Sequence, residues 1–149
     1  FTLLAPIDQS TVKVSFFGGL KVGRVAKPEK TDDEVACVAS LDDLLAHKLK
    51  AIHDRAEGKD YQDIAEMLAH GMDLAEGLGG RLALFGSSVP TMATVKALTW
   101  FKDINEAWRL TDARKQLIVT SVRNLPERIP EVNLDETTLR CSAATSYGF

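Results

Sequence analysis

The sequence predicts an α+β fold in which short strands at the amino end are followed by a helical bundle. Strand-like alternation of apolar and polar side chains is confined to the first forty residues, whereas helix-like spacing of apolar side chains dominates residues 41–124. Such segregation of strands from helices along the chain is typical of α+β domains. The length of 149 residues and the 45% hydrophobic content allow a sizeable core and exclude a disordered chain.

The strand signals begin at residues 11–17, where apolar and polar side chains alternate. This period of two is typical of a strand with one buried face. A Gly-Gly pair then predicts a turn, after which residues 20–26 can return as a second strand. A polar loop over residues 27–34 leads to the short apolar run 35–39, which predicts a third strand or an extended approach to the first helix.

The first helix is predicted over residues 41–56, because Ser40 can cap its amino end and Asp42 and Asp43 place carboxylates in its first turn. Four further helices are predicted over residues 60–70, 73–85, 90–101 and 111–124. Three glycines weaken the prediction for residues 73–85. We expect these elements to form one domain over residues 1–130, followed by an extended tail over residues 131–149.

Composition and charge exclude several classes of protein. The net charge is −3, and residues 41–80 hold nine acidic and four basic side chains, so a uniformly basic nucleic-acid-binding domain is excluded. No apolar run approaches the roughly 20 residues that span a bilayer, so we expect no membrane segment. The two cysteines, Cys37 and Cys141, form no CxxC or Cys/His cluster, which argues against a zinc site and favours the reducing cytoplasm.

Two basic side chains lie on the apolar face of the first helix. Lys48 is four residues after Leu44 and four before Ile52, and Arg55 lies one heptad further along the same side. A lysine within an apolar stripe must extend to water or meet an anion. Taken alone, the Lys48 side chain can extend along the helix until its ammonium group reaches solvent. The Arg55 side chain can likewise be solvated at the end of the helix.

The second helix carries charges of the opposite sign. Asp60 shares an arc with Ile64, and Asp63 borders that arc. Taken alone, Asp60 is explained as the N-cap of the helix and Asp63 as a favourable charge in its first turn. If the two helices form an antiparallel hairpin, however, the two acidic groups meet Lys48 and Arg55 near the turn. The cluster is then either a buried ion-pair network or a site for anionic phosphates.

Residues 40–64, SLDDLLAHKLKAIHDRAEGKDYQDI, resemble the C-terminal signature of the AbiEii/AbiGii-type nucleotidyltransferase toxin family. That signature has a Ser-Leu-Glu/Asp-Asp-Leu start, a Lys-Leu-x-Ala-Ile core, an Arg, and a Lys/Arg-Asp-x-x-Asp ending. The earlier VKVSFF and the later ALTWFKD segments also fit the family. The resemblance thus covers most of the chain and is densest over about 25 residues, far beyond a chance dipeptide match.

The resemblance implies both a fold and a function. The chain would be the C-terminal part of a polymerase-β-like nucleotidyltransferase, a toxin of a toxin–antitoxin or phage-defence system. Its substrates would be an NTP and an RNA acceptor, the 3′ end of tRNA in some members, with Mg²⁺ as cofactor and a cognate antitoxin as partner. Matched residue by residue, Lys48 is the phosphate-binding lysine and Asp60 the late catalytic aspartate, while Arg55 and Asp63 are accompanying substrate-binding positions.

The chain also departs from the family pattern. It lacks the Gly-Ser helix start and the Asp-x-Asp strand whose carboxylates hold Mg²⁺. Gly86-Ser87 follows the signature without an Asp-x-Asp and predicts a loop, and the acidic run 32–34 predicts a solvated loop. We therefore predict no metal ligand here, and expect the chain to be inactive alone. Because residue 1 is Phe, we expect the missing motifs to lie upstream.

Two alternatives stay open at this point. The chain can instead be a non-catalytic helical binding module that pairs with an antitoxin or another protein, with the four charged residues as a structural network. Separately, the aromatic side chains of Trp100, Phe101 and Trp108 lie near Lys96 and Lys102. They are explained either by packing between helices or by stacking on an RNA base.

Overall fold

The computed structural model describes residues 2–7, 10–15, 23–34, 36–102, 104 and 110–136. Two antiparallel strand pairs precede a group of helices, so the predicted α+β class is confirmed. None of the described helices combines the length and the apolar composition needed to cross a membrane. In chain order the elements are β1 (Thr2–Ile7), β2 (Ser10–Ser15), β3 (Glu29–Lys30), β4 (Cys37–Val38), α1 (Leu41–Asp54), α2 (Gly58–Ala69), α3 (Leu74–Phe85), α4 (Thr91–Leu98) and α5 (Asp112–Arg123).

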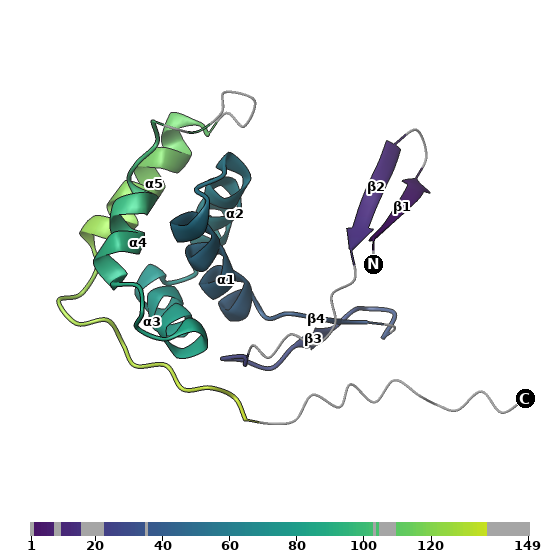
Figure 1. Ribbon diagram of the computed structural model, residues 1–149, viewed down its shortest axis with the longest axis horizontal. Helices are drawn as coiled ribbons and strands as arrows, with labels where there is room; N and C mark the ends of the chain where they lie inside the picture. The colour runs from purple at the N-terminus through teal and green to yellow at the C-terminus, as the bar shows by residue number, and fades with distance from the viewer. Residues whose placement is uncertain are drawn as a thin grey trace, which may run out of the picture.

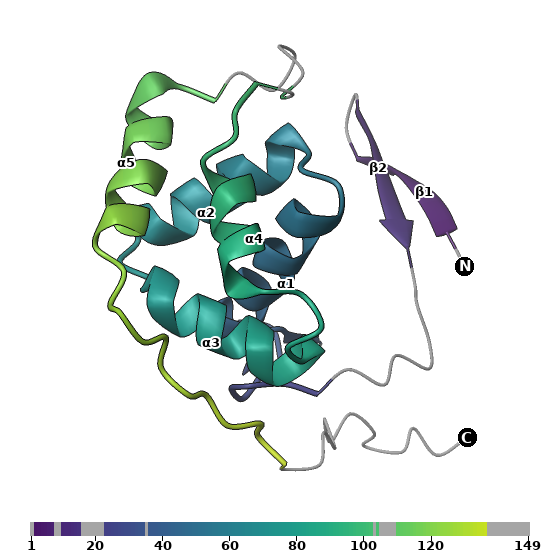
Figure 2. The same ribbon diagram turned by 60° about the vertical axis from the view of Figure 1, so that its left-hand side comes forward.

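The amino-terminal hairpin stands to one side of the helices, as two views of the molecule show (Figures 1 and 2). β1 and β2 pair in an antiparallel register that sets Leu3 opposite Val14 and Ala5 opposite Val12. The predicted pairing of residues 11–17 with residues 20–26 is therefore wrong. Within 20–26, the described residues 23–26 form no strand, and residues 16–22 lie outside the described part.

Sequence periodicity missed β1 for a physical reason. Its residues, TLLAPI, run as consecutive apolar side chains with a proline, so they lack the alternation that identifies a half-buried strand. The second pair is minimal: β3 and β4 each contribute two residues, with Glu29 opposite Val38 and Lys30 opposite Cys37. The expected strand at 35–39 is thus confirmed at β4, whereas the expected loop 27–34 contains β3.

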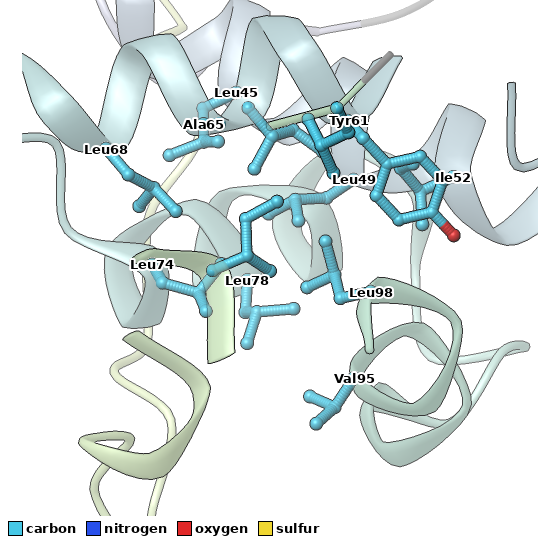
Figure 3. Packing of buried hydrophobic residues seen from close by; sticks show 13 residues of the cluster. Leu45, Leu49, Ile52, Tyr61, Ala65, Leu68, Leu74, Leu78, Val95 and Leu98 are labelled. Carbon is cyan, nitrogen blue, oxygen red and sulfur yellow. The ribbon is translucent and has the colours of Figure 1, made fainter. Parts of the chain in front are cut away.

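The core is built around α1, which packs against α2, α3 and α4. Figure 3 shows Leu45, Leu49 and Ile52 of α1 among apolar side chains of the other helices. The apolar face predicted for this helix is only partly correct, because Leu41 and Leu44 are 48% and 40% exposed. The buried face is centred instead on Leu45 and Leu49, since the neighbouring helices cover that side of α1.

Glycines in α3 allow neighbouring segments to approach closely. A Cβ atom at Gly77 would lie 2.5 Å from Cδ2 of Leu45, and one at Gly79 would lie 2.5 Å from the carbonyl oxygen of Pro130. Glycine lowers helix propensity, but tertiary packing of a buried face supplies most of the stability of a helix in a protein. The helix predicted over 73–85 therefore forms, and its glycines are required by packing.

The helix ends agree with the predictions at some positions and differ at others. Ser40 caps α1, accepting a hydrogen bond from the backbone N–H of Asp43 at 3.1 Å. α4 ends at Leu98, three residues before the predicted end. α2 begins at Gly58, two residues earlier than predicted, because its N-cap is Glu57.

Beyond α5 the chain runs without regular secondary structure as far as Glu136, passing alongside α3 (Figure 1). The backbone N–H of Asp135 donates to the carbonyl oxygen of Arg24 at 2.8 Å, and Nε of Arg24 donates to the Asp135 carboxylate at 3.1 Å. Leu134 approaches Gly23. The described part of this segment is therefore attached to the chain between β2 and β3, while residues 137–149 lie outside the described part and the predicted tail boundary stays a prediction.

Candidate functional site

The candidate site lies at the corner between α1 and α2. α1 ends at its C-cap Arg55, Ala56 adopts a left-handed backbone with φ of 48°, and Glu57 begins α2 as its N-cap. This short turn folds α2 back against α1. The first turns of α2 are thereby brought beside the middle and the end of α1, which is the hairpin that the sequence analysis required.

Asp60 is the centre of the cluster. Its side chain is 0% exposed, and its carboxylate accepts hydrogen bonds from Lys48 Nζ at 3.0 Å and from Arg55 Nε and Nη2 at 3.1 and 3.2 Å. Arg55 thus donates from one edge of its guanidinium to both oxygens of the carboxylate. This bidentate geometry gives the strongest ion pairs of this kind. One buried carboxylate in α2 therefore binds both a lysine within α1 and the arginine at the end of α1.

Asp63 forms the outer side of the cluster. Its carboxylate contacts Lys48 Nζ, and its side chain is 50% exposed. The side chains of Lys48 and Arg55 are 27% and 47% exposed. The four charged residues predicted from the sequence therefore converge at one corner, with Asp60 inside and the other three open to solvent in different degrees.

The ionisation of the cluster follows from these contacts. Burial by itself would raise the pKa of Asp60, but hydrogen bonds from Arg55 and Lys48 outweigh burial and hold the pKa of this carboxyl below its ordinary value. Burial would likewise lower the pKa of Lys48, yet its hydrogen bonds to Asp63 and Asp60 raise that pKa. The hydrogen bond to Asp60 raises the pKa of Arg55. All three groups are thus stabilised in their charged forms.

The structure corrects one interpretation of Asp60. It is not the N-cap of α2, because the helix has already begun at Gly58 and the backbone N–H of Asp60 donates to the carbonyl oxygen of Glu57 at 2.9 Å. Its carboxylate has no local partner of the capping type and is used for the two cations instead. The buried charge therefore belongs to the tertiary arrangement.

The cluster is not built to hold a divalent metal ion. Both oxygens of Asp60 are engaged by cations, and Asp63 contacts the same lysine. Throughout the part of the chain that the structure describes, no group of three or more His, Cys, Asp or Glu side chains could hold a metal ion. Gly86 and Ser87 lie in an exposed loop after α3, and the described acidic run 32–34 is exposed.

Sequence reasoning missed the tertiary role of Asp43. This residue is 5% exposed, and its carboxylate accepts hydrogen bonds from the backbone N–H of Val25 at 2.7 Å and from the Ser40 hydroxyl at 2.8 Å. The Ser-Leu-Asp-Asp start of the signature was interpreted only as a helix cap. It also fastens the segment before β3 to the beginning of α1, which no local pattern signals.

The aromatic residues near the end of α4 lie in different surroundings, and packing between helices is confirmed only for Phe101. Phe101 packs against Tyr61, with ring centroids 5.6 Å apart, and belongs to the margin of the core. Trp100 is half-exposed, and the ammonium group of Lys102 lies 5.0 Å from the centre of its ring. Trp108 lies outside the described residues.

Comparison with known proteins assigns the chain to a family. A family model described as nucleotidyl transferase AbiEii toxin, type IV toxin–antitoxin system, matches residues 2–137. No curated protein and no solved structure matches the chain. The match extends from β1 past α5 and includes all four residues of the charged corner. The chain therefore belongs to the AbiEii nucleotidyl transferase toxin family of type IV toxin–antitoxin systems.

Proposed function

We propose that this protein takes part in transferring a nucleotide from an NTP to an RNA acceptor, and that Lys48 and Arg55 bind the phosphates of the NTP. The acceptor that we favour is the 3′ end of tRNA, with a polymerase-β-like catalytic fold to which this chain contributes the C-terminal part. The family supports toxin activity opposed by a cognate antitoxin. Because NTPs and tRNA are cytoplasmic, we place the reaction in the cytoplasm.

The observation that carries this proposal is the shared carboxylate of Asp60. A buried carboxylate that binds two cations from different parts of α1 fixes both cations in one orientation. Arg55 uses Nε and Nη2 for Asp60, so Nη1 is directed away from that carboxylate. Preorganised cations of this kind stabilise phosphate charge better than mobile ones, because they need little reorganisation when the ligand binds.

Asp63 has a different role in the proposal. Asp63 is half-exposed and, of the two cations, contacts Lys48 but not Arg55. A triphosphate oxygen can therefore replace the Asp63 carboxylate at Lys48 without disturbing Asp60. The two cations of the corner are balanced by two carboxylates, and the exchange of Asp63 for phosphate keeps Lys48 paired throughout. Asp60 is then a positioning residue for Lys48 and Arg55, and the two cations are the groups that contact the substrate.

The chemistry requires these cations where negative charge accumulates. In nucleotidyl transfer the acceptor hydroxyl gives up its proton to solvent as its oxygen forms a bond to the α-phosphorus. The bond from that phosphorus to the α–β bridging oxygen breaks, and pyrophosphate leaves. Charge grows on the leaving phosphates, and Lys48 and Arg55 would neutralise it. Both side chains are cations at neutral pH at their ordinary pKa values, and their hydrogen bonds to carboxylates raise the pKa of each further.

Mg²⁺, which the family resemblance implies, does not fit these four residues. Asp60 has no free oxygen for a metal, and Asp63 alone offers too few ligands for a hard divalent cation. A Mg²⁺ ion serving this reaction would need other ligands.

The alternative function is a non-catalytic binding module that pairs with an antitoxin. The balanced charge of the corner favours it, since two cations matched by two carboxylates can simply join α1 to α2. In that case the network stabilises the hairpin and no nucleotide binds. The two functions therefore differ in whether removal of a cation changes NTP affinity or only stability.

The experiment compares two lysines of the same helix. Lys48→Met removes a cation of the corner, and Lys50→Met removes a lysine whose partner is Asp54 outside it. Isothermal titration of the 149-residue chain with each of the four NTPs should show at least about tenfold weaker binding for Lys48→Met, because a charge-assisted phosphate contact is lost. Lys50→Met should bind as the wild type does.

A second pair of variants checks the roles of the carboxylates. Asp63→Asn should bind NTP as well as or better than the wild type, because a competitor for Lys48 is removed, whereas Asp60→Asn should bind more weakly. Circular dichroism confirms that each variant is folded. Failure of the wild-type chain to bind any NTP, or equal binding by Lys48→Met and Lys50→Met, would contradict the proposal and favour the binding module.

A further inference from the structure

A second buried charge lies in α3, near the amino end of α4 and outside the corner that contains Lys48. Arg81 of α3 is 1% exposed, and its Nη2 donates to the carbonyl oxygen of Val89 at 2.9 Å. Its Nε and Nη1 are buried and have no hydrogen-bond partner among the described residues. In the same part of the chain Arg81 forms no ion pair, although the charge of Asp54 reaches it.

A buried guanidinium with two unmatched donors is unusual. Buried charges in proteins are generally paired, and buried N–H groups nearly always have an acceptor. Burial lowers the pKa of Arg81, which shows that its surroundings disfavour the cation. An apolar residue of similar length would fill this position without the desolvation penalty of a buried cation. We therefore expect the guanidinium to have an acceptor that the described residues do not supply.

The guanidinium is directed at the amino end of α4. Val89, which accepts its one hydrogen bond, immediately precedes the N-cap Pro90, and Pro90 provides no side-chain cap. Thr94 in the first turns of α4 is 0% exposed, and its hydroxyl oxygen has no partner among the described residues. Residues at the positions of Val89 and Thr94 lie on the same side of a helix amino end.

We propose that Arg81, the amino end of α4 and the Thr94 hydroxyl form a buried binding site for a tetrahedral phosphate oxyanion. Each component supplies what such an ion needs: a fixed cation with N–H donors, the positive end of a helix dipole, and a neutral hydroxyl donor. Val89 brings the cation and the helix end together. The site does not depend on the proposed nucleotide transfer.

The enclosure of the site selects a small ligand. The unmatched nitrogens of Arg81 are buried, and one described hydrogen bond joins the guanidinium to Val89, just before α4. A ligand that meets these covered atoms must therefore be compact, such as inorganic phosphate or the terminal phosphate of a nucleotide. A phosphodiester within an RNA strand carries a substituent on each side and fits this enclosure poorly.

The probe is inorganic phosphate, titrated calorimetrically into the 149-residue chain with chloride of equal ionic strength as the blank. The expected result is saturable binding with one site and a melting temperature that rises with phosphate concentration. Parallel titrations with ATP and with a short RNA lacking a terminal phosphate identify the source of the oxyanion. Binding of the RNA alone would overturn the compact-ligand proposal.

Three variants locate the binding. Arg81→Met should weaken phosphate binding by more than about tenfold and abolish the rise in melting temperature. Thr94→Val, which keeps volume and charge, should weaken binding by about three- to tenfold, as expected for one hydrogen bond. Arg55→Met is titrated alongside, because loss of binding in that variant would place the anion at the corner instead.

Two results would overturn the proposal. One is phosphate binding that survives Arg81→Met but is lost in Arg55→Met, which would assign the anion to the corner. The other combines two observations. Phosphate does not bind, and Asp54→Asn destabilises the wild-type protein but not the Arg81→Met variant. That coupling would show that Asp54 is the partner of Arg81 in solution.

Discussion

Asp60 and Arg81 are both charged side chains buried within the helical part of this protein, yet their surroundings differ. Asp60 meets two cations through three hydrogen bonds. Within the described part of the chain, Arg81 meets one carbonyl oxygen and two of its nitrogens have no partner. Burial is nearly complete at both positions, with 0% and 1% of each residue exposed. Burial alone therefore does not determine what a charge contributes to the fold.

The comparison separates two uses of a buried charge. At Asp60 the partners compensate for desolvation, so removing the carboxylate leaves two cations without their common acceptor. At Arg81 most of the desolvation is uncompensated, so removing the charge relieves a cost. Substitution at the two positions should consequently change stability in opposite directions.

The largest effect is expected for Asp60→Ala. Loss of three charge-assisted hydrogen bonds should lower the free energy of unfolding by about 3 kcal/mol, measured by urea denaturation at neutral pH. The cations are partly exposed and regain some hydration, which keeps the loss below that of a fully buried pair. Asp63→Ala is the matched control. Because the Asp63 side chain is half-exposed, its loss should lower the free energy of unfolding by less than about 1 kcal/mol. Equal losses would mean that Asp60 is no better paired than a surface carboxylate.

Acidification should remove the same stabilisation gradually. Because the pKa of Asp60 in the folded protein lies below its ordinary value of 3.8, its contribution is present above that value and is lost as pH falls through the folded pKa. The stability difference between the wild type and Asp60→Asn should therefore stay constant above about pH 5 and shrink below about pH 4. Denaturation curves of both proteins across this range measure it. A difference that persists unchanged at pH 3 would refute the role of charge.

Arg81→Met should have the opposite sign. In phosphate-free buffer we expect the free energy of unfolding to rise by about 1–2 kcal/mol, because an uncompensated buried cation is replaced by an apolar side chain of similar length. Arg24→Met provides the control, since Arg24 is paired with Asp135 and its loss should be destabilising. Destabilisation by Arg81→Met would show that the guanidinium has acceptors in solution, and the comparison with Asp60 would then fail.

The smallest effect is expected for Lys50→Ala. Lys50 pairs with Asp54 along the exposed side of α1, and such pairs contribute only about 0.3–0.5 kcal/mol. The unfolding free energy should therefore change by no more than this amount, and the change should disappear in high salt. A larger loss would indicate that Lys50 contributes to stability beyond its exposed pair with Asp54.

Local patterns predicted the helices well because helix formation depends on neighbours in sequence. Ser40 caps α1 as expected, and Asp73 and Thr111 cap α3 and α5 with hydrogen bonds from residues two or three positions later. Prediction was poorer at α2, where the left-handed Ala56 shifts the helix start to Gly58. It failed at β1, whose pairing with β2 depends on another segment of the chain.

The candidate site was predictable to the extent that helical periodicity placed opposite charges on two adjacent apolar faces. Lys48, Arg55, Asp60 and Asp63 indeed come together at the corner. Their geometry was not predictable, because full burial of Asp60 and half exposure of Asp63 depend on how α2 packs. Arg81 gave no signal, since nothing in its sequence neighbourhood indicates that α4 and the loop before it will cover it.

The amino-acid sequence by itself determined that strands precede helices, that Ser40 caps α1, and that four charges lie on two adjacent helices, because periodicity and capping act over a few residues. Tertiary structure decided which side of α1 is buried, which strand pairs with β2, why α3 needs glycine, and which buried charge has partners. Those outcomes depend on contacts between residues far apart in the chain, whose free energies arise only when the helices pack together.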